Sequence, residues 1–297
     1  MSKESILVTG ASGLVGSDFV DHSLNYQIFT PEYPEFDLSD PECVRRTIEK
    51  YHPEWVINFA AFTDVNAAEE QTGDIQGTVW KTNVEGVENL VTAFPSNKII
   101  QISTDMVFEG NLQNPGPYAE SDKTPDSPEK LTWYGWSKNR AEKLVLHQGG
   151  TVLRIIYPVR ANFPNKLDYI RAALDKYRSG KMYPLFDDQQ ICIAFISEVT
   201  ETLQKIITTN SHGVFHAASD TTTPYELITF VVDQLGGDSS VIKSAHIQNF
   251  LATQKNPNRY PVYGGLKTII TEEKLDLHFS TWQTVVEKLI GQGLSLK

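Results

Sequence analysis

The fold is decided near the start of the chain, where residues 5–16 read SILVTGASGLVG. The apolar run at the start of this stretch predicts a buried strand, and Gly10, Gly13 and Gly16 follow it in a G-x-x-G-x-x-G spacing that opens a helix. The first glycine permits a tight turn, the second lets backbone approach a pyrophosphate, and the third lets the helix pack closely on the strand. We therefore predict a dinucleotide-binding turn, with a purely structural turn as the alternative.

Outward from this turn, apolar strands alternate with helices as far as residue 156. We expect strands over 26–30, 55–60, 98–103 and 151–156, and helices over 14–24, 41–51, 82–94 and 134–148. Unbroken apolar strands separated by helices predict a parallel sheet that is covered on both faces. The predicted fold class is α/β, a Rossmann-type doubly wound parallel sheet with a smaller C-terminal α/β substrate lobe.

The alternation weakens after Tyr157, which predicts two domains. Residues 1–156 are expected to form the NAD(P)-binding Rossmann domain, with its sheet completed by parts of 190–220. Residues 157–297 are expected to form mainly a substrate-binding lobe, interwoven with the first domain and carrying helices over 166–179, 197–209, 224–235 and 281–290. We expect the loop from Glu109 to Lys130 to be a solvated surface segment, with a substrate lid as the alternative.

Composition excludes several classes of protein. The 297 residues carry a net charge of −11, which argues against nucleic acid or an anionic membrane as the main partner. No apolar run approaches the ~20 residues of a membrane span. Cys43 and Cys192 are too far apart in sequence to suggest a disulfide framework or a zinc site, and the histidines lack metal-ligand spacing. We therefore expect a cytoplasmic protein without a metal.

A second motif, Tyr134-Gly135-Trp136-Ser137-Lys138, places a phenol and an ammonium on one face of a helix. The lysine charge is expected to favour the phenolate and lower the tyrosine pKa from about 10, which suits proton transfer near neutral pH. Alone, this spacing also fits a solvated helix face. The strand ending at Ser103-Thr104-Asp105 strengthens the catalytic interpretation, because ligands bind beyond the carboxyl ends of parallel strands.

The strand end supplies two candidate groups. The Thr104 hydroxyl could bond a carbonyl oxygen as charge develops there, or cap a turn. Asp105 could bond a substrate hydroxyl, or accept backbone N–H bonds. Asn83 could cap its helix or contribute to a proton relay.

Cofactor choice is normally made at the end of the second strand, which here reads Phe29-Thr30-Pro31-Glu32. An acidic residue there binds the ribose hydroxyls of NAD, whereas an arginine accommodates the phosphate of NADP. Thr30 could bond either ribose, Glu32 lies beyond a proline, and no arginine is present, so the choice stays open. Asp37 and Leu38 could cover the adenine or simply lead into the next helix.

Together these residues resemble the extended short-chain dehydrogenase/reductase superfamily, and within it most closely the dTDP-4-dehydrorhamnose reductase family. The resemblance runs from about residue 6 to about residue 235. It rests on Val8 to Gly16, Asp37 to Pro41, Asn58 to Val65, Ala68-Glu69, Asn83-Val84, Ser103 to Phe108 and the Tyr134–Lys138 motif.

The resemblance implies an NAD(P)-dependent oxidoreductase of dTDP-rhamnose biosynthesis that reduces the 4-keto group of a nucleotide-linked 6-deoxy sugar. The expected cofactor is NADP or NAD, with NADPH slightly favoured. In this interpretation Tyr134 protonates the carbonyl oxygen of the sugar, and Thr104 binds the same oxygen. Lys138 holds the nicotinamide ribose. The substrate is bound by Asp105, Tyr157 and Arg259. The cofactor would contact Gly10, Ser12, Gly13, Leu14, Val15, Gly16, Thr30, Asp37, Leu38, Ala60, Ala61, Phe62, Asn83, Tyr134 and Lys138.

The residues that differ from the family pattern are ones that would contact the substrate. Met106 stands where the family usually has tyrosine, and Tyr157 where it usually has tryptophan. Two alternatives stay open: a nucleotide-sugar epimerase or dehydratase, and a non-catalytic NADP-binding regulatory subunit like the β subunit of methionine adenosyltransferase. A homodimer is one possible assembly.

Overall fold

The computed structural model describes residues 3–254, 257 and 260–296. The chain forms two compact units that interleave along the sequence. The first unit comprises Met1–Val107, Lys123–Arg154 and Val199–Phe215. The second comprises Phe108–Asp122, Ile155–Glu198 and His216–Lys297. The assignment of a cofactor domain and a substrate lobe to particular residues stays a prediction.

A six-stranded sheet forms the centre of the first unit. Its strands, in order across the sheet, are β2 (Gln27–Phe29), β1 (Ser5–Thr9), β3 (Trp55–Asn58), β4 (Ile99–Thr104), β5 (Thr151–Ile155) and β9 (Gly213–Ala217). The β1–β2, β1–β3 and β3–β4 pairs are parallel, with Leu7 opposite both Phe29 and Val56. Parallel strands end at the same edge, so the residues that follow β1, β3 and β4 are brought together there.

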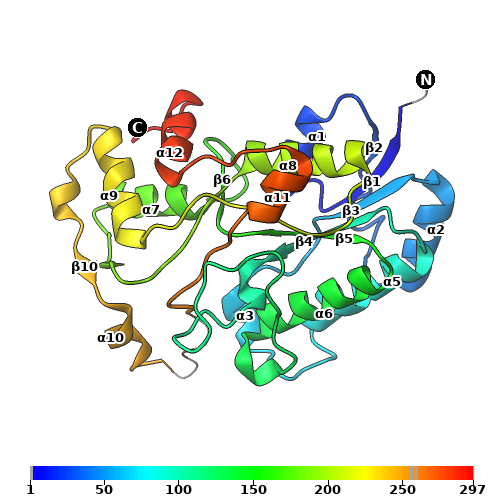
Figure 1. Ribbon diagram of the computed structural model, residues 1–297, viewed down its shortest axis with the longest axis horizontal. Coiled ribbons are helices and arrows are strands. Elements are labelled where there is room, and N and C mark those ends of the chain that lie inside the picture. The colour runs from blue at the N-terminus through cyan, green and yellow to red at the C-terminus, as the bar shows by residue number, and fades with distance from the viewer. Residues whose placement is uncertain (1–2, 255–256, 258–259, 297) are drawn as a thin grey trace. The chain divides into compact units, whose positions relative to one another are not determined.

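Helices cover both faces of this sheet (Figure 1). On one face lie α2 (Pro41–Tyr51), α5 (Gly86–Ala93) and α6 (Trp133–His147), and on the other α1 (Gly16–His22) and α8 (Ile196–Thr209). The first group shares one apolar core with the strands, which includes Val44, Val56, Leu90 and Val145. Burying such side chains contributes roughly 1.5–3 kcal/mol each.

Local signals explain why these helices begin where they do. The Asp40 carboxylate caps α2 by accepting from the backbone N–H groups of Glu42 and Cys43, as its position before Pro41 predicts. Thr132 caps α6 in the same way, accepting from Gly135 N at 2.9 Å. The first unit also contains α3 (Val65–Glu69), α4 (Thr78–Trp80), a π-helical turn (Lys81–Glu85) and 3₁₀ turns at Asp105–Val107 and Pro128–Lys130.

The second unit has its own apolar core, which includes Val159, Leu174, Ile228 and Val285. Its strands are β6 (Pro158–Val159), β7 (Leu185–Phe186), β8 (Ala194–Phe195) and β10 (Ser244–Ala245). Its helices are α7 (Tyr169–Arg178), α9 (Pro224–Gln234), α10 (Ile247–Leu251), α11 (Ile269–Leu275) and α12 (Trp282–Gly291), with a 3₁₀ turn at Ser239–Val241. Of the helices that the structure describes, none is both long and apolar enough to cross a membrane.

The expectation of a solvated loop from Glu109 to Lys130 is wrong for its first half. Tyr118 is 3% exposed and stacks on Phe108, and its backbone pairs with the segment at Leu266. Glu120 is also buried, and its carboxylate accepts from Thr271 N and Oγ1. Aromatic packing and buried hydrogen bonds outweigh the polar composition that suggested a surface loop.

Candidate active site

The glycine-rich turn follows β1 and is shaped by contacts that exclude larger residues. Gly10 has φ +65°, and a Cβ on it would lie 2.7 Å from Ala60 N, which is backbone and cannot move aside easily. A Cβ on Gly16 would lie 2.5 Å from Gly10 O. The backbone therefore forms a side-chain-free cradle at the start of α1, which fits the pyrophosphate of a dinucleotide.

A pocket of about 250 Å³ opens beside this turn. Five of the predicted cofactor-contacting residues line it: Gly10, Ser12, Asp37, Leu38 and Ala60. The pocket also reaches Ala11, Pro31, Glu32, Tyr33, Phe36, Ser39 and Thr82, which sequence reasoning did not assign to the cofactor. The other predicted contacts outside its lining are Gly13, Leu14, Val15, Gly16, Thr30, Ala61, Phe62, Asn83, Tyr134 and Lys138. Their role toward a cofactor stays a prediction.

A buried line of polar side chains crosses the sheet from this turn. Thr9 Oγ1 donates to Asn58 Oδ1, and Asn58 Nδ2 donates to Gln101 Oε1 at 2.7 Å. Gln101 Nε2 then donates to the carbonyl of Ile102, which also accepts from Lys138 Nζ at 2.7 Å. Thr9, Asn58 and Gln101 are fully buried. Sequence reasoning did not identify this network, although amides in otherwise apolar strands are an available signal, because buried polar groups need partners.

Thr104 ends β4 at the carboxyl edge of the sheet, as predicted. Its hydroxyl donates to Asp105 Oδ1 at 3.2 Å and accepts from Met106 N at 3.2 Å. Both residues of the Thr104–Asp105 pair are buried, with 8% and 7% exposed. These contacts hold the Thr104 oxygen in a defined position at the strand end, and its O–H can reach a developing oxyanion only by turning away from Asp105.

The glycine of the Tyr-Gly-x-x-Lys motif brings α6 against this strand end. A Cβ on Gly135 would lie 2.1 Å from Met106 O, so only glycine allows so close an approach. Tyr134 precedes this contact, and its pKa responds to the charge of Asp105. The structure therefore brings Tyr134 close to the residues that follow β4.

The predicted effect of Lys138 on Tyr134 is wrong for this structure. Burial, with a further contribution from the Asp105 carboxylate, raises the pKa of Tyr134 instead of lowering it. Burial also lowers the pKa of Lys138 to about 8, although the Glu142 carboxylate opposes this change. The Lys138 ammonium donates to the Ile102 carbonyl, and the phenol stays protonated at neutral pH.

Asn83 lies in the π-helical turn before α5 and ties neighbouring segments together. Its side chain exchanges hydrogen bonds with the backbone of Phe62, with Phe62 N donating at 2.8 Å and Phe62 O accepting at 3.1 Å. It also donates to Ser137 Oγ on α6 at 2.9 Å. These contacts give it a structural role that the expected helix cap does not describe.

In the second unit, the predicted substrate contacts are partly described. Tyr157 has φ +38°, a left-handed conformation that is uncommon for a large residue, and its ring is 4.6 Å from that of Tyr169. Its backbone carbonyl accepts from Ala194 N at 3.3 Å, which helps to hold this conformation. Arg259, the other predicted contact in this part of the chain, lies outside the described residues.

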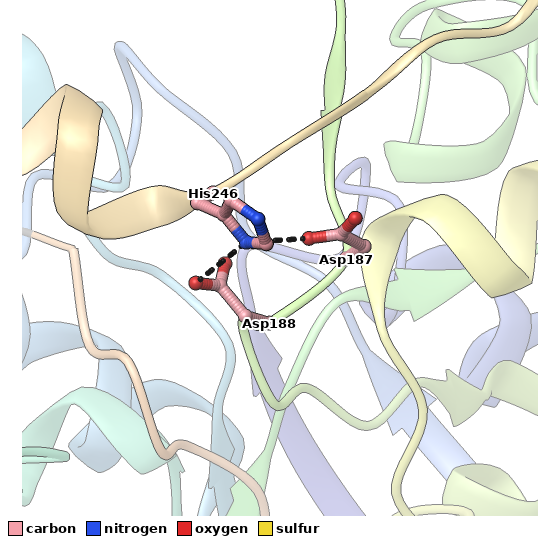
Figure 2. Close-up of side chains that lie close together, drawn as sticks. All are labelled: Asp187, Asp188 and His246. Atoms are coloured by element: carbon pink, nitrogen blue, oxygen red, sulfur yellow. Dashed lines mark ion pairs between the residues drawn. The ribbon is translucent and has the colours of Figure 1, made fainter.

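The second unit also gathers a histidine and two carboxylates that sequence spacing did not connect. Figure 2 shows Asp187 and Asp188, which follow β7, facing His246 at the start of α10. His246 Nδ1 lies 3.1 Å from Asp187 Oδ1 and 3.4 Å from Asp188 Oδ2, and Asp188 Oδ1 also accepts from Ile247 N. Such a set could hold a metal ion, but the ion pairs account for the arrangement without one. The expectation of no metal stays a prediction.

Similarity to known proteins identifies the family. The model of the RmlD substrate binding domain matches residues 4–294. The chain belongs to this family. The membership confirms the resemblance to dTDP-4-dehydrorhamnose reductases.

Relatives of this RmlD-family chain have more than one described role. The chain is 27% identical over 266 residues to a dTDP-4-keto-6-deoxy-D-glucose reductase of Streptomyces niveus, covering 87% of this chain and 88% of that protein. It is 26% identical over 255 residues to methionine adenosyltransferase 2 subunit beta of Danio rerio, covering 79% and 75%.

Among solved structures, dTDP-4-dehydrorhamnose reductase of Bacillus anthracis in complex with NADP has a TM-score of 0.82. The identity is 19%, and the match covers 98% of this chain and 99% of that one. This likeness confirms the predicted Rossmann-type α/β fold.

Proposed function

We propose that this chain reduces the 4-keto group of a nucleotide-linked 6-deoxy sugar with NADH or NADPH. One observation carries the proposal. The close approach of Gly135 to Met106 packs the N-terminal part of α6, which holds Tyr134 and Lys138, against the end of β4, where Thr104 lies. The reductase of Streptomyces niveus and the NADP-bound neighbour support the reaction class and the cofactor class.

The chemical step would use the reduced nicotinamide and two side chains, those of Tyr134 and Thr104. A bound reduced nicotinamide would supply hydride to the carbonyl carbon. The Tyr134 phenol would donate its proton to the carbonyl oxygen, and its raised pKa keeps that proton available at neutral pH. Thr104 would turn its O–H from Asp105 toward the same oxygen, where negative charge develops.

The remaining residues would bind and orient. Gly10, Gly13 and Gly16 would present backbone to the pyrophosphate, and Asp37, Leu38 and Ala60 would enclose the adenosine end. Lys138 would hold the nicotinamide ribose. The remaining cofactor contacts would be Ser12, Leu14, Val15, Thr30, Ala61, Phe62 and Asn83.

Asp105 and Tyr157 would contact the sugar, and Arg259 the nucleotide diphosphate. In this proposal 1–156 is the cofactor domain, and 157–297 contains most of the substrate lobe. A cytoplasmic homodimer stays a prediction.

The direct test is oxidation of NADH or NADPH by the purified chain in the presence of a dTDP-4-keto-6-deoxy-hexose. Substrate-dependent oxidation is the expected result. Replacing Tyr134 with Phe should reduce turnover roughly 10²–10⁴-fold while the cofactor still binds, because positioned proton transfer contributes about that much. Tyr26→Phe, a change outside the site, serves as the matched control and should leave turnover unchanged.

The second candidate is a regulatory subunit, which the likeness to methionine adenosyltransferase 2 subunit beta favours. Such a protein would bind the cofactor, turn over no keto sugar and form a complex with a separate enzyme. Cofactor binding without oxidation of any tested nucleotide-linked keto sugar would therefore favour this candidate over the reductase.

A further inference from the structure

The pocket beside the glycine-rich turn carries acidic but no basic side chains among its described lining residues. Glu32 and Asp37 line it, together with apolar and small polar residues. If the proposed function is right, this pocket receives the adenosine end of the cofactor, where NAD has a ribose hydroxyl and NADP has a phosphate. The chemistry of the lining therefore bears on which cofactor the chain accepts.

Local hydrogen bonds fix the acidic segment in place. The backbone carbonyl of Glu32 accepts from Phe36 N at 3.0 Å, which closes the turn after β2. Asp37 Oδ1 accepts from Ser39 N at 2.9 Å and from Ser39 Oγ at 2.7 Å. Asp37 N also lies 3.4 Å from Cys43 Sγ on α2. The Asp37 carboxylate is therefore held by its neighbours rather than free to swing away.

The arginines of the helix that follows the pocket segment do not contribute to the pocket lining. Arg45 lies on α2, the helix that follows the pocket segment, and forms ion pairs with Glu42 and Glu49 on the same helix. Neither Arg45 nor Arg46 lines the pocket. The bidentate guanidinium contact that NADP-binding sites use for the phosphate is therefore missing from the described lining.

We infer that this chain selects NADH over NADPH, with Glu32 and Asp37 as the discriminating residues. A carboxylate accepts hydrogen bonds from the free ribose hydroxyls of NADH. The 2′-phosphate of NADPH adds about −1.5 to −2 charges, as phosphate monoesters do near pH 7, and is repelled by the same carboxylates. This inference reverses the slight preference for NADPH expected from the sequence.

The test measures the Kd of NADH and of NADPH by isothermal titration calorimetry on the intact chain. We expect NADH to bind at least about tenfold more tightly, and the ratio to shrink as salt screens the repulsion. The combined Glu32→Gln and Asp37→Asn variant should reduce the ratio, mainly by tightening NADPH. Asparagine and glutamine keep the hydrogen-bonding oxygen, so the turns should persist.

The matched control is Glu35→Gln, which removes an exposed carboxylate from the same segment but outside the pocket lining. It should leave the ratio as in the parent chain. Equal or tighter binding of NADPH would overturn the inference while leaving the proposed reductase in place. An unchanged ratio in the combined variant would overturn the assignment to these two residues. Binding of neither cofactor would overturn the proposed function itself.

Discussion

Replacing Lys138 with methionine should stabilise the protein at neutral pH while abolishing turnover. The side chain is 3% exposed, and burial lowers its pKa to about 8, so folding moves a charged group into an unfavourable environment. Methionine fills a similar volume without the charge. The Ile102 carbonyl keeps Gln101 as a donor, so the substitution orphans no acceptor on β4.

The magnitude and the pH window follow from the pKa shift of Lys138. The fall from 10.5 to about 8 corresponds to about 3 kcal/mol of unfolding free energy. Below the folded pKa, the lysine is protonated in both states, and the full penalty applies. Between about 8 and 10.5 the folded state loses its proton while the unfolded state keeps it, so the stability of the parent chain rises with pH. Above that window the penalty has disappeared.

The assay compares urea unfolding of the parent chain and Lys138→Met from neutral to strongly alkaline pH. Groups that titrate elsewhere contribute equally to both proteins, so the difference isolates Lys138. The variant's advantage should be greatest at neutral pH and should fall through the alkaline window. The exposed Lys176→Met change is the control and should show no such trend. A variant less stable at neutral pH, or a difference that does not change with pH, would refute the reasoning.

Three further substitutions test the rest of the site. Gly10→Ala should abolish cofactor binding measured by calorimetry, because its Cβ would lie 2.7 Å from Ala60 N at a positive φ. Retained affinity would contradict the proposal that the glycine turn binds the pyrophosphate. Asn58→Leu should lower the unfolding free energy by about 1–3 kcal/mol in urea titrations, because it leaves buried partners on both neighbouring strands unsatisfied. Glu142→Leu should cost about 3–5 kcal/mol in the same assay, because the buried Arg154 guanidinium loses this carboxylate; a neutral effect would show that the pair contributes little.

Features governed by short-range rules could be predicted from the sequence. β1 and its glycine turn follow from an apolar run that ends at a residue needing positive φ, and the start of α2 follows from Asp40 and Pro41. Thr104 was correctly placed at a strand end, because the apolar stretch before it has the length of a strand. These elements depend on residues that are neighbours in the chain.

What the sequence did not predict depends on contacts between distant residues. The line from Thr9 to Gln101 joins three strands, and nothing near any one of them identifies its partner. The pKa of Tyr134 depends on burial and on Asp105, neither of which a four-residue spacing on a helix contains. Glu32 lines the pocket because the chain turns back at Phe36, a bend that the proline-containing sequence does not specify.

The buried polar line gives the site a physical basis for alignment. Amides in the centre of a sheet are costly unless each hydrogen bond is made, so Asn58 and Gln101 favour one relative arrangement of β1, β3 and β4. That arrangement fixes the Ile102 carbonyl, which holds Lys138, and the end of β1, from which the glycine turn begins. The same contacts that position the lysine therefore also position the glycine turn that we propose as the pyrophosphate site. Burial of Lys138 costs stability, as expected for a residue whose proposed role is to hold the nicotinamide ribose.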